Sequence, residues 1–264
     1  LLGENGAGKS TLMSILFGHY VADTGAIEVF GRPLPPANPK AALVAGIGMV
    51  HQHFTLADNL SVLDNVLLGS ESLWQPFSRR STARQKLLDV AKRFGLPVAP
   101  EARVGTLTVG ERQRVEILKA LYRGARILIL DEPTAVLTPQ ESEALFDTLG
   151  QMVSQGLSII FISHKLAEVL RVSTRVAVLR SGKLVAEAVA SDVTQAQLAQ
   201  WMVGHGVDAP QKKPTTQVTP DVCVLSGVST DAKNRERLEN VSLKLHGGEI
   251  VAIAGVSGNG QAAL

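Results

Sequence analysis

Short apolar runs alternate along this chain with segments whose apolar residues recur at helical spacing. Four runs are typical of buried strands: LL at the start, GIGMV, ARILILDEP and LSIIFISH. Helices are predicted between them, for STLMSILFG and for the segment that begins at the capping box Thr138-Pro139-Gln140-Glu141 and extends to about Gln155. Buried strands that alternate with helices predict an α/β fold with a parallel sheet covered on both faces.

Weaker patterns complete the first part of the chain. GAIEVFGRPL indicates a short strand, and Asn38-Pro39 indicates a helix start for KAALVAG, because proline suits the first helical position. The stretch from Leu56 to Gly124 is mostly helical in pattern, and the helical block between Gln52 and Ile127 is predicted to be an insertion into the α/β plan. RVAVLRSGKLVAEAV predicts a hairpin that turns at Ser181-Gly182, and TQAQLAQWMVG predicts a closing helix.

A change of composition divides the chain into two parts. Residues 205–220 have few large apolar side chains and include QKKPTTQVTP, which is typical of a linker. We therefore expect a first domain over residues 1–204 and the start of a second over 221–264, where VCVLSGV, NVSLKL and GEIVAIAG predict strands. Near the end, IAGVSGNGQAAL repeats the pattern of LLGENGAGKSTL, so the second domain is predicted to be a copy of the first.

Composition narrows the functional classes. Of the 264 residues 45% are hydrophobic, enough for a proper core, and the net charge of +2 gives no basic footprint for nucleic acid. The single cysteine, Cys223, excludes an internal disulfide and a cysteine metal cluster, and suits the cytosol. No apolar run approaches the roughly 18 residues that span a membrane, and no signal peptide is visible. Because the first residue is not methionine, we expect an internal fragment.

The residues from Gly3 to Ser10 match the phosphate-binding loop (P-loop) pattern G-x-x-x-x-G-K-[ST], with the required strand before it and helix after it. Glycines let successive backbone N–H groups turn inward around an anion, and the helix adds its positive N-terminal end. Lys9 is predicted to reach the β- and γ-phosphates of a nucleotide, and the Ser10 hydroxyl to bind Mg²⁺. The alternative is a glycine-rich turn with an exposed lysine. The expected nucleotide contacts are Gly3, Glu4, Asn5, Gly6, Ala7, Gly8, Lys9, Ser10 and Thr11.

ILILDEP places two acidic residues at the end of a predicted buried strand. Asp131 at that position can hold Mg²⁺, often through water, and Glu132 can orient or deprotonate an attacking water. A strand followed by an acidic turn is the simpler interpretation, but the presence of the P-loop favours the catalytic one.

LTVGERQRVEILKAL, residues 107–121, resembles the signature segment of ATP-binding cassette (ABC) ATPases, LSGGQ followed by a helix. Thr108 keeps the hydroxyl of the consensus serine and Gly110 keeps a glycine that permits close approach to a phosphate, whereas Val109 and Glu111 depart from the consensus. In this family the signature binds the γ-phosphate held by the opposing cassette. The resemblance therefore implies Thr108, Gly110 and Glu111 as nucleotide contacts. An amphipathic helix with a glycine at its start is the alternative.

The remaining ABC landmarks follow in the family's order. Gln52, after the strand GIGMV, matches the Q-loop glutamine that senses Mg²⁺ and the membrane partner, and joins Ser10 and Asp131 as an implied metal contact. His164 matches the switch histidine that contacts the γ-phosphate, although a lone histidine after a strand is more often a plain surface or core residue. PTAVLT matches the D-loop, with Thr138 where aspartate is usual. The implied catalytic residues are Glu132, His164, Lys9 and Gln52.

The repeat near the end, residues 255–262, departs from the P-loop pattern. Gln261 stands for the lysine and Ala262 for the metal-binding serine or threonine, so this loop lacks a cation for phosphates and a ligand for Mg²⁺. ABC geometry pairs each P-loop with the signature of the other cassette. The resemblance therefore predicts one competent and one degenerate site in the full-length protein.

The resemblance covers essentially the whole chain and implies ATP and Mg²⁺ as cofactors. Two fused cassettes with a VGE-type signature and a G-x-G-N-G-Q second loop resemble the ATP-hydrolysing subunits of bacterial importers for simple sugars and nucleosides, and look closer to the nucleoside members than to the ribose members. The implied partners are transmembrane permease subunits, an indirectly coupled extracytoplasmic solute-binding protein and a second cassette in the same full-length chain, without nucleic acid. The implied location is peripheral, on the cytoplasmic face of the inner membrane.

Two other classes share much of this chemistry. Soluble tandem-cassette proteins that act on ribosomes or DNA usually carry a long charged linker or an inserted arm, whereas the linker here is short and has little charge beyond Lys212-Lys213. A P-loop kinase or GTPase would require the signature and His164 matches to be accidental, and a GTPase would prefer guanine nucleotides strongly.

Overall fold

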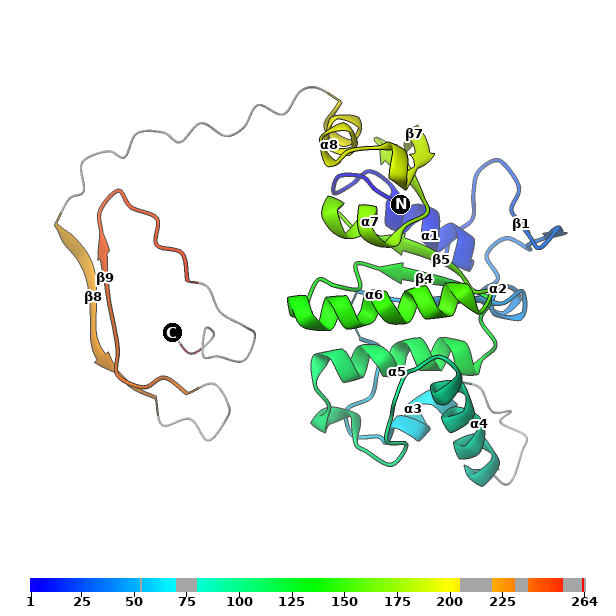
Figure 1. The fold of residues 1–264 in the computed structure, drawn as a ribbon, viewed down its shortest axis with the longest axis horizontal. Coiled ribbons are helices and arrows are strands. Elements are labelled where there is room, and N and C mark those ends of the chain that lie inside the picture. Colours follow the sequence, from blue (N-terminus) through cyan, green and yellow to red (C-terminus); the bar gives the residue numbers. More distant parts are fainter. Residues whose placement is uncertain (53, 70–79, 205–219, 231–236, 254–262, 264) are drawn as a thin grey trace. The chain divides into compact units, whose positions relative to one another are not determined.

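The computed structural model describes residues 1–52, 54–69, 80–204, 220–230, 237–253 and 263 (Figure 1). The chain forms two compact units, Leu1–Val207 and Asp208–Leu264. The first unit contains the P-loop, the acidic strand end and the signature segment, so it is the unit that carries the candidate site.

Three parallel strands form the central sheet of the first unit. Their order is β3 (Ile47–Val50), β4 (Ile127–Asp131) and β5 (Ser158–Ile162). The side chains of β4 alternate between two cores. Leu128 and Leu130 belong to one core, and Ile129 belongs to the other. Because each face of the strand is buried, the near-continuous apolar run ILIL is what this position requires.

Helices cover both faces of this sheet, as Figure 1 shows. Met13 of α1 (Lys9–Phe17) and Ala42 of α2 (Pro39–Val44) share a core with Ile129. The opposite core is filled from α3 (Val62–Leu67), α4 (Arg80–Arg93), α5 (Val109–Tyr122), α6 (Pro139–Ser154), α7 (Leu166–Val172) and α8 (Gln195–Val203). The predicted parallel sheet with helices on both faces is therefore confirmed.

The first residues of the chain lie between β5 and the next strand, β6 (Arg175–Arg180). Leu1 N donates to the carbonyl of Phe161 at 2.7 Å. Leu2 N donates to the carbonyl of Ala177, and Leu179 N donates back to Leu2, both at 2.8 Å. Leu2 is fully buried. The two leucines thus occupy a strand position that leads directly into the P-loop, as their apolar character predicts.

Two hairpins flank the sheet. The one between β6 and β7 (Lys183–Val189) turns at Ser181 and Gly182, as predicted, and both have positive φ, 48° and 75°. GAIEVFGRPL is not the single strand that its pattern indicated. It forms β1 (Glu28–Val29) and β2 (Arg32–Pro33) around Phe30 and Gly31, whose φ angles are 50° and 72°. Two consecutive positive φ values make the tight turn that a short hairpin needs, and this interrupts the strand.

The helical prediction for residues 56–124 is correct only in part. The structure has α3, α4 and α5 there, with a short 3₁₀ helix, Val104–Thr106, before α5. Residues 96–103 are not helical. The backbone of this segment bonds to the α3 region instead, since Val62 N donates to Ala102 and Leu63 N to Pro100, both at 2.9 Å. These long-range bonds satisfy groups that a helix would have paired locally.

In the second unit, β8 (Asp221–Val228) and β9 (Val241–His246) form an antiparallel hairpin. The prediction of a third strand, GEIVAIAG, is wrong for the residues that the structure describes, because residues 248–253 do not form a strand. Ile250 is 98% exposed there. The apolar run predicts burial, but Val251 and Ile253 are exposed as well. The second glycine loop, residues 255–262, lies outside the described residues.

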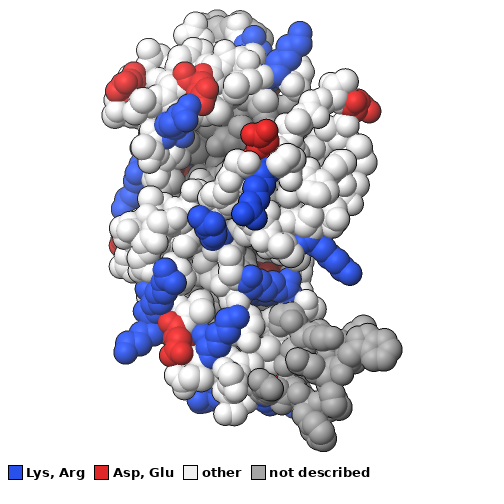
Figure 2. Space-filling model, turned by 90° about the vertical axis from the view of Figure 1, so that its right-hand side faces the viewer, with Lys and Arg blue, Asp and Glu red and all other residues white. Residues whose placement is uncertain are grey.

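Charge is unevenly distributed over the surface. Lys and Arg dominate the charged side chains on the side of the molecule that faces right in Figure 1, as Figure 2 shows. Because the net charge is only +2, this local excess is balanced elsewhere in the chain. Among the described helices, none is long and apolar enough to cross a lipid bilayer.

Candidate nucleotide site

The P-loop makes its turn at glycines, for two different reasons. A Cβ at Gly3 would lie 2.5 Å from the carbonyl oxygen of Leu179, so the loop begins in direct backbone contact with β6. Gly6 and Gly8 have φ angles of 80° and 97°, in the left-handed region that favours glycine. Gly8 is the N-cap residue of α1, so the loop leads directly into a helix N-terminus, the kind of position at which proteins bind anions.

Lys9 points back into the loop that precedes it. Its Nζ donates to the carbonyls of Gly3 at 2.7 Å and Glu4 at 3.0 Å, and the residue is only 7% exposed. A buried ammonium needs such partners, because it has left water. The predicted alternative, an exposed lysine on a plain turn, is therefore wrong. Ser10 and Thr11, in the first turn of α1, are exposed.

The turn between β6 and β7 packs against the P-loop and is hydrogen-bonded to it. Gly182 N donates to the carbonyl of Ala7 at 3.1 Å, and a Cβ at Gly8 would lie 3.6 Å from Gly182 Cα. Ala7 is 4% exposed. The sequence predicted the turn at Ser181-Gly182 but gave no sign that it holds the loop, since the contact joins residues about 175 positions apart.

The predicted acidic pair lies where β4 ends. Burial and the charge of Glu132 raise the pKa of Asp131 above its usual value, while the charges of His51 and Lys9 oppose the rise. Since Lys9 acts on this carboxyl, the P-loop and the end of β4 share one electrostatic environment. Glu132 has a φ of 48°, and its N–H donates to Ile162 at 2.9 Å. A left-handed glutamate is strained, a condition common at functional sites.

Glu132 and His164 are 32 residues apart in sequence but in contact in the structure. His164 Nδ1 lies 2.9 Å from Glu132 Oε1. His164 follows β5 and Glu132 follows β4, so the parallel strands bring both to one sheet edge. Gln52 follows β3 and is exposed at the same edge. The carboxyl ends of parallel strands are where ligands of open α/β sheets bind.

The predicted metal contacts suit a cation that takes some of its oxygen ligands from the protein and the rest from phosphate and water. Ser10 offers a hydroxyl, Asp131 a carboxylate and Gln52 an amide oxygen, all from segments that end at this edge. Among the described residues, no group of three or more His, Cys, Asp and Glu forms a metal cage. Mg²⁺ characteristically takes one or two carboxylates plus substrate phosphates, so the donor set fits Mg²⁺ bound with a nucleotide.

The signature segment begins α5. Thr108 and Glu111 form a capping box: Glu111 Oε2 accepts from Thr108 N at 2.8 Å, and Thr108 Oγ1 accepts from Glu111 N at 3.3 Å. The hydrogen bonds that the Glu111 carboxylate accepts from Thr108 N and from Thr108 Oγ1 lower the pKa of Glu111. A Cβ at Gly110 would lie 2.8 Å from Glu141 Oε1, so Gly110 also permits close packing of α5 on α6. Thr138 caps α6 with Glu141, which gives this departure from aspartate a structural role.

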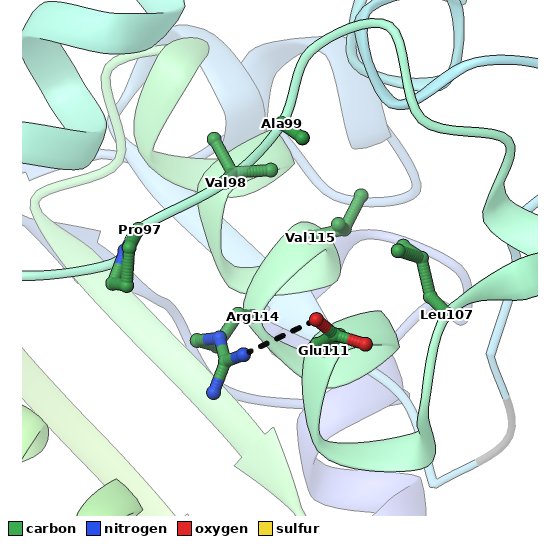
Figure 3. Close-up of a pocket in the computed structure, with 7 residues that line it drawn as sticks. All are labelled: Pro97, Val98, Ala99, Leu107, Glu111, Arg114 and Val115. Carbon is green, nitrogen blue, oxygen red and sulfur yellow. Dashed lines mark ion pairs between the residues drawn. The ribbon is translucent and has the colours of Figure 1, made fainter.

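The structure does not bring all predicted site residues together. Within the described part of the chain, no hydrogen bond or ion pair joins Thr108, Gly110 or Glu111 to the P-loop, Asp131 or His164. A pocket of about 340 Å³ instead lies beside the signature (Figure 3), lined by Pro97, Val98, Ala99, Leu107, Glu111, Arg114 and Val115. Glu111 and Arg114 face each other there at 4.0 Å. None of the P-loop residues lines it, so the pocket is separate from the phosphate site.

Sequence reasoning missed one buried acidic residue. Glu116 of α5 is 5% exposed and accepts two hydrogen bonds from Thr55, three residues after Gln52. Its only signal was a single acid among the apolar residues Val115, Ile117 and Leu118. Such an interruption of an apolar helix face marks a buried polar contact that must be satisfied.

Comparison with known proteins finds relatives that are named as import ATP-binding proteins. The chain is 46% identical to a glucose import ATP-binding protein of Haloferax volcanii, over 99% of this chain and 53% of the relative. It is 46% identical to a guanosine import ATP-binding protein of Bacillus subtilis and 41% identical to a ribose import ATP-binding protein of Burkholderia ambifaria, each over all of this chain and 52% of the relative. The chain thus spans about half the length of these curated relatives.

Solved structures share the fold. The cbiO1 protein from Clostridium perfringens, part of an ABC transporter complex, is 27% identical, with a TM-score of 0.64 over 75% of this chain and 79% of that one. An ATP-binding cassette in its ADP conformation matches with a TM-score of 0.67 and 24% identity, over 77% and 86% of the two chains. The ABC transporter family description matches residues 1–135, about half of the chain. With the P-loop, the acidic strand end and the signature in the family's order, this chain belongs to the ABC transporter family.

Proposed function

We propose that this chain is the ATP-binding and ATP-hydrolysing part of a membrane importer. The observation that carries the proposal is the Glu132–His164 contact at the ends of two neighbouring parallel strands, in a unit whose P-loop has Lys9 folded into it. Lys9 acts electrostatically on Asp131, the neighbour of Glu132, which supports a role for Glu132 in activating the water that attacks a bound phosphate.

Each residue has a role that its position supports. The glycine loop and α1 bind the phosphates, and Lys9 exchanges its carbonyl partners for phosphate oxygens. Ser10, Asp131 and Gln52 would hold Mg²⁺, which would supply positive charge to offset the negative charge on the phosphates. Glu132 accepts a proton from the attacking water, and His164, held at 2.9 Å from Glu132, contacts the γ-phosphate.

The site is proposed to be completed by a second cassette. In the described part of the chain, Thr108, Gly110 and Glu111 make no hydrogen bond or ion pair with the P-loop, which supports a role toward a nucleotide held by another cassette. The curated relatives are about twice as long as this chain, which fits a full-length protein with two cassettes. We propose domains at residues 1–204 and 221–264, joined by residues 205–220. Gln261 and Ala262 make the second P-loop the degenerate one.

The imported solute is proposed to be a nucleoside or a simple sugar. The relatives with 41–46% identity are named for glucose, nucleoside, guanosine and ribose import. The identity to the glucose relative equals that to the guanosine relative, so sequence likeness supports the class of small polar solutes rather than one member. The proposed partners are permease subunits and, through them, a solute-binding protein, with the chain at the cytoplasmic face of the inner membrane.

Uptake and hydrolysis test this proposal together. In cells that lack the full-length gene, we expect loss of uptake of labelled nucleosides or of labelled sugars, with rescue by the wild-type gene. Lys9→Ala should fail to rescue, because the phosphates lose their cation, and the purified complex should lose ATP hydrolysis. Lys92→Ala, on the exposed face of α4, is the matched control and should rescue. Unchanged uptake of every solute, or hydrolysis that survives Lys9→Ala, would contradict the proposal.

A further inference from the structure

A buried carboxylate on the signature helix holds the loop that carries Gln52. Glu116 lies two turns into α5 and is 5% exposed, between the fully buried Val115 and Ile117. Placing a carboxylate in such a position is costly unless it is hydrogen-bonded. The sequence has no need of an acid here for helix capping, because Thr108 and Glu111 already form the capping box. Glu116 therefore requires another explanation.

The partner of Glu116 lies 61 residues earlier in the chain. Glu116 Oε1 accepts a hydrogen bond from Thr55 N at 2.5 Å and a second from Thr55 Oγ1 at 2.9 Å. Lys119 Nζ, one turn further along α5, donates to Thr55 Oγ1 at 3.4 Å. Charge-assisted hydrogen bonds to a buried carboxylate are stronger than neutral ones. One exposed loop residue is thus held by two side chains of α5.

Further contacts hold the same side of the loop. Asn65 of α3 is fully buried; its Oδ1 accepts from Ala57 N at 2.7 Å and its Nδ2 donates to Ala57 O at 3.0 Å. Arg112 of α5 pairs with Asp58 at 3.1 Å. Residues 55–58 are therefore anchored to the helices, whereas Gln52 is exposed. Three residues span at most about 10 Å, so the place of Thr55 limits where Gln52 can lie.

We infer that Glu116 is a positioning residue for Gln52: through Thr55 it fixes the loop so that the Gln52 amide reaches the Mg²⁺ of a bound nucleotide. The inference rests on the proposed function, and it adds a link between the signature helix and the metal side of the site. Because α5 begins at the signature and carries Glu116, a displacement of the signature is transmitted to the loop by one rigid helix.

Nucleotide titrations of the 264-residue chain test this inference. A fluorescent, slowly hydrolysed ATP analogue is titrated with Mg²⁺ and, separately, with EDTA. Mg²⁺ should raise the affinity of the wild-type chain for the analogue. In Glu116→Ala this increase should be about fivefold smaller, the effect of losing one hydrogen bond, while the affinity measured in EDTA should stay within about twofold of the wild-type value. Glu116→Gln keeps an acceptor oxygen and should preserve the gain. Ile117→Val, which removes one methylene from the adjacent fully buried residue, is the matched control and should also preserve it.

A second variant approaches the contact from the exposed loop residue. Thr55→Pro removes both the N–H and the hydroxyl donor and should reproduce the loss seen with Glu116→Ala. In Glu116→Ala, hydrogen exchange at the Thr55 amide should accelerate, since that amide is the donor of the 2.5 Å bond. Each of these readouts reports on the loop rather than on the stability of the whole chain.

The outcomes are separable. If a variant loses affinity equally in Mg²⁺ and in EDTA, Glu116 only supports the fold and the inference is wrong. The inference is also wrong if Mg²⁺ raises the affinity of both Glu116→Ala and Thr55→Pro as much as it raises that of the wild type. If the wild-type chain binds ATP but gains nothing from Mg²⁺, the proposed metal contacts fail and the inference fails with them. If the wild-type chain binds no ATP, it is the proposed function that fails.

Discussion

Replacement of Gly3 by alanine should destabilise the fold at the entrance to the P-loop. The new Cβ would lie 2.5 Å from Leu179 O and 2.9 Å from Ala7 Cβ. An ordinary carbon–oxygen contact is about 3.3–3.6 Å, so the two backbones must separate by roughly 1 Å. They are held together by two hydrogen bonds of 2.8 Å, from Leu2 N to Ala177 O and from Leu179 N to Leu2 O. Separation therefore strains both bonds.

The magnitude follows from those two bonds. Each backbone hydrogen bond contributes about 0.5–1.5 kcal/mol net, so weakening both costs about 1–3 kcal/mol, the range observed for an overpacked interior. For a domain of this size, about 2 kcal/mol lowers Tm by roughly 4–8 °C. Urea unfolding followed by circular dichroism measures the free energy, and the same variant should bind ATP more weakly because the loop is displaced.

Gly150→Ala is the matched control. Gly150 lies within α6, and a Cβ there meets nothing within 4 Å. Alanine should stabilise this helix by about 0.5–1 kcal/mol, since glycine loses more backbone entropy on folding. The two glycine-to-alanine changes should thus move stability in opposite directions. A Gly3→Ala chain within about 0.5 kcal/mol of wild type would refute the packing argument, because the close approach to β6 would then carry no energetic weight.

Three further predictions concern the site. Asp131→Asn should raise Tm at pH 7, because burial and Glu132 raise the pKa of this carboxyl; the ionised form therefore destabilises the fold. The gain in Tm should vanish when the pH is below 3.8, the ordinary pKa of an aspartate, and should grow as the pH rises through the raised pKa of Asp131. Thermal melts that show the same gain at pH 3 and at pH 7 would contradict this prediction. Gly110→Ala should lower the free energy of unfolding by about 1 kcal/mol when Glu141 is present, because the new Cβ would lie 2.8 Å from Glu141 Oε1. In the Glu141→Ala background the same change should be neutral or stabilising, and a double-mutant cycle that finds no coupling would exclude the contact. Glu132→Gln should keep ATP binding but lower hydrolysis by the full-length complex about 10²-fold or more, and near-normal turnover would remove Glu132 from the base role.

The fold was largely predictable where a pattern is local. Buried strands such as β4 have a continuous apolar run because both faces are covered, and α6 begins at a capping box that four consecutive residues define. Predictions failed where tertiary contacts decide. Phe30 and Gly31 adopt positive φ and split one apparent strand into a hairpin, and Ile250 belongs to an apolar run that has no partner in the described part of its unit.

The sequence by itself determined the phosphate-binding loop, the acidic strand end and the signature, because the spacing of glycine, lysine and carboxylates within a few residues sets their local geometry. Only the tertiary structure decided which distant groups meet. The contact of Glu132 with His164 depends on the register of β4 against β5, and that of Glu116 with Thr55 depends on how α5 packs beside the loop after β3. Such contacts join residues 32 and 61 positions apart, and no local spacing rule reaches that far. They form because parallel strands end at one edge of the sheet and because a buried carboxylate must find a donor wherever the fold supplies one.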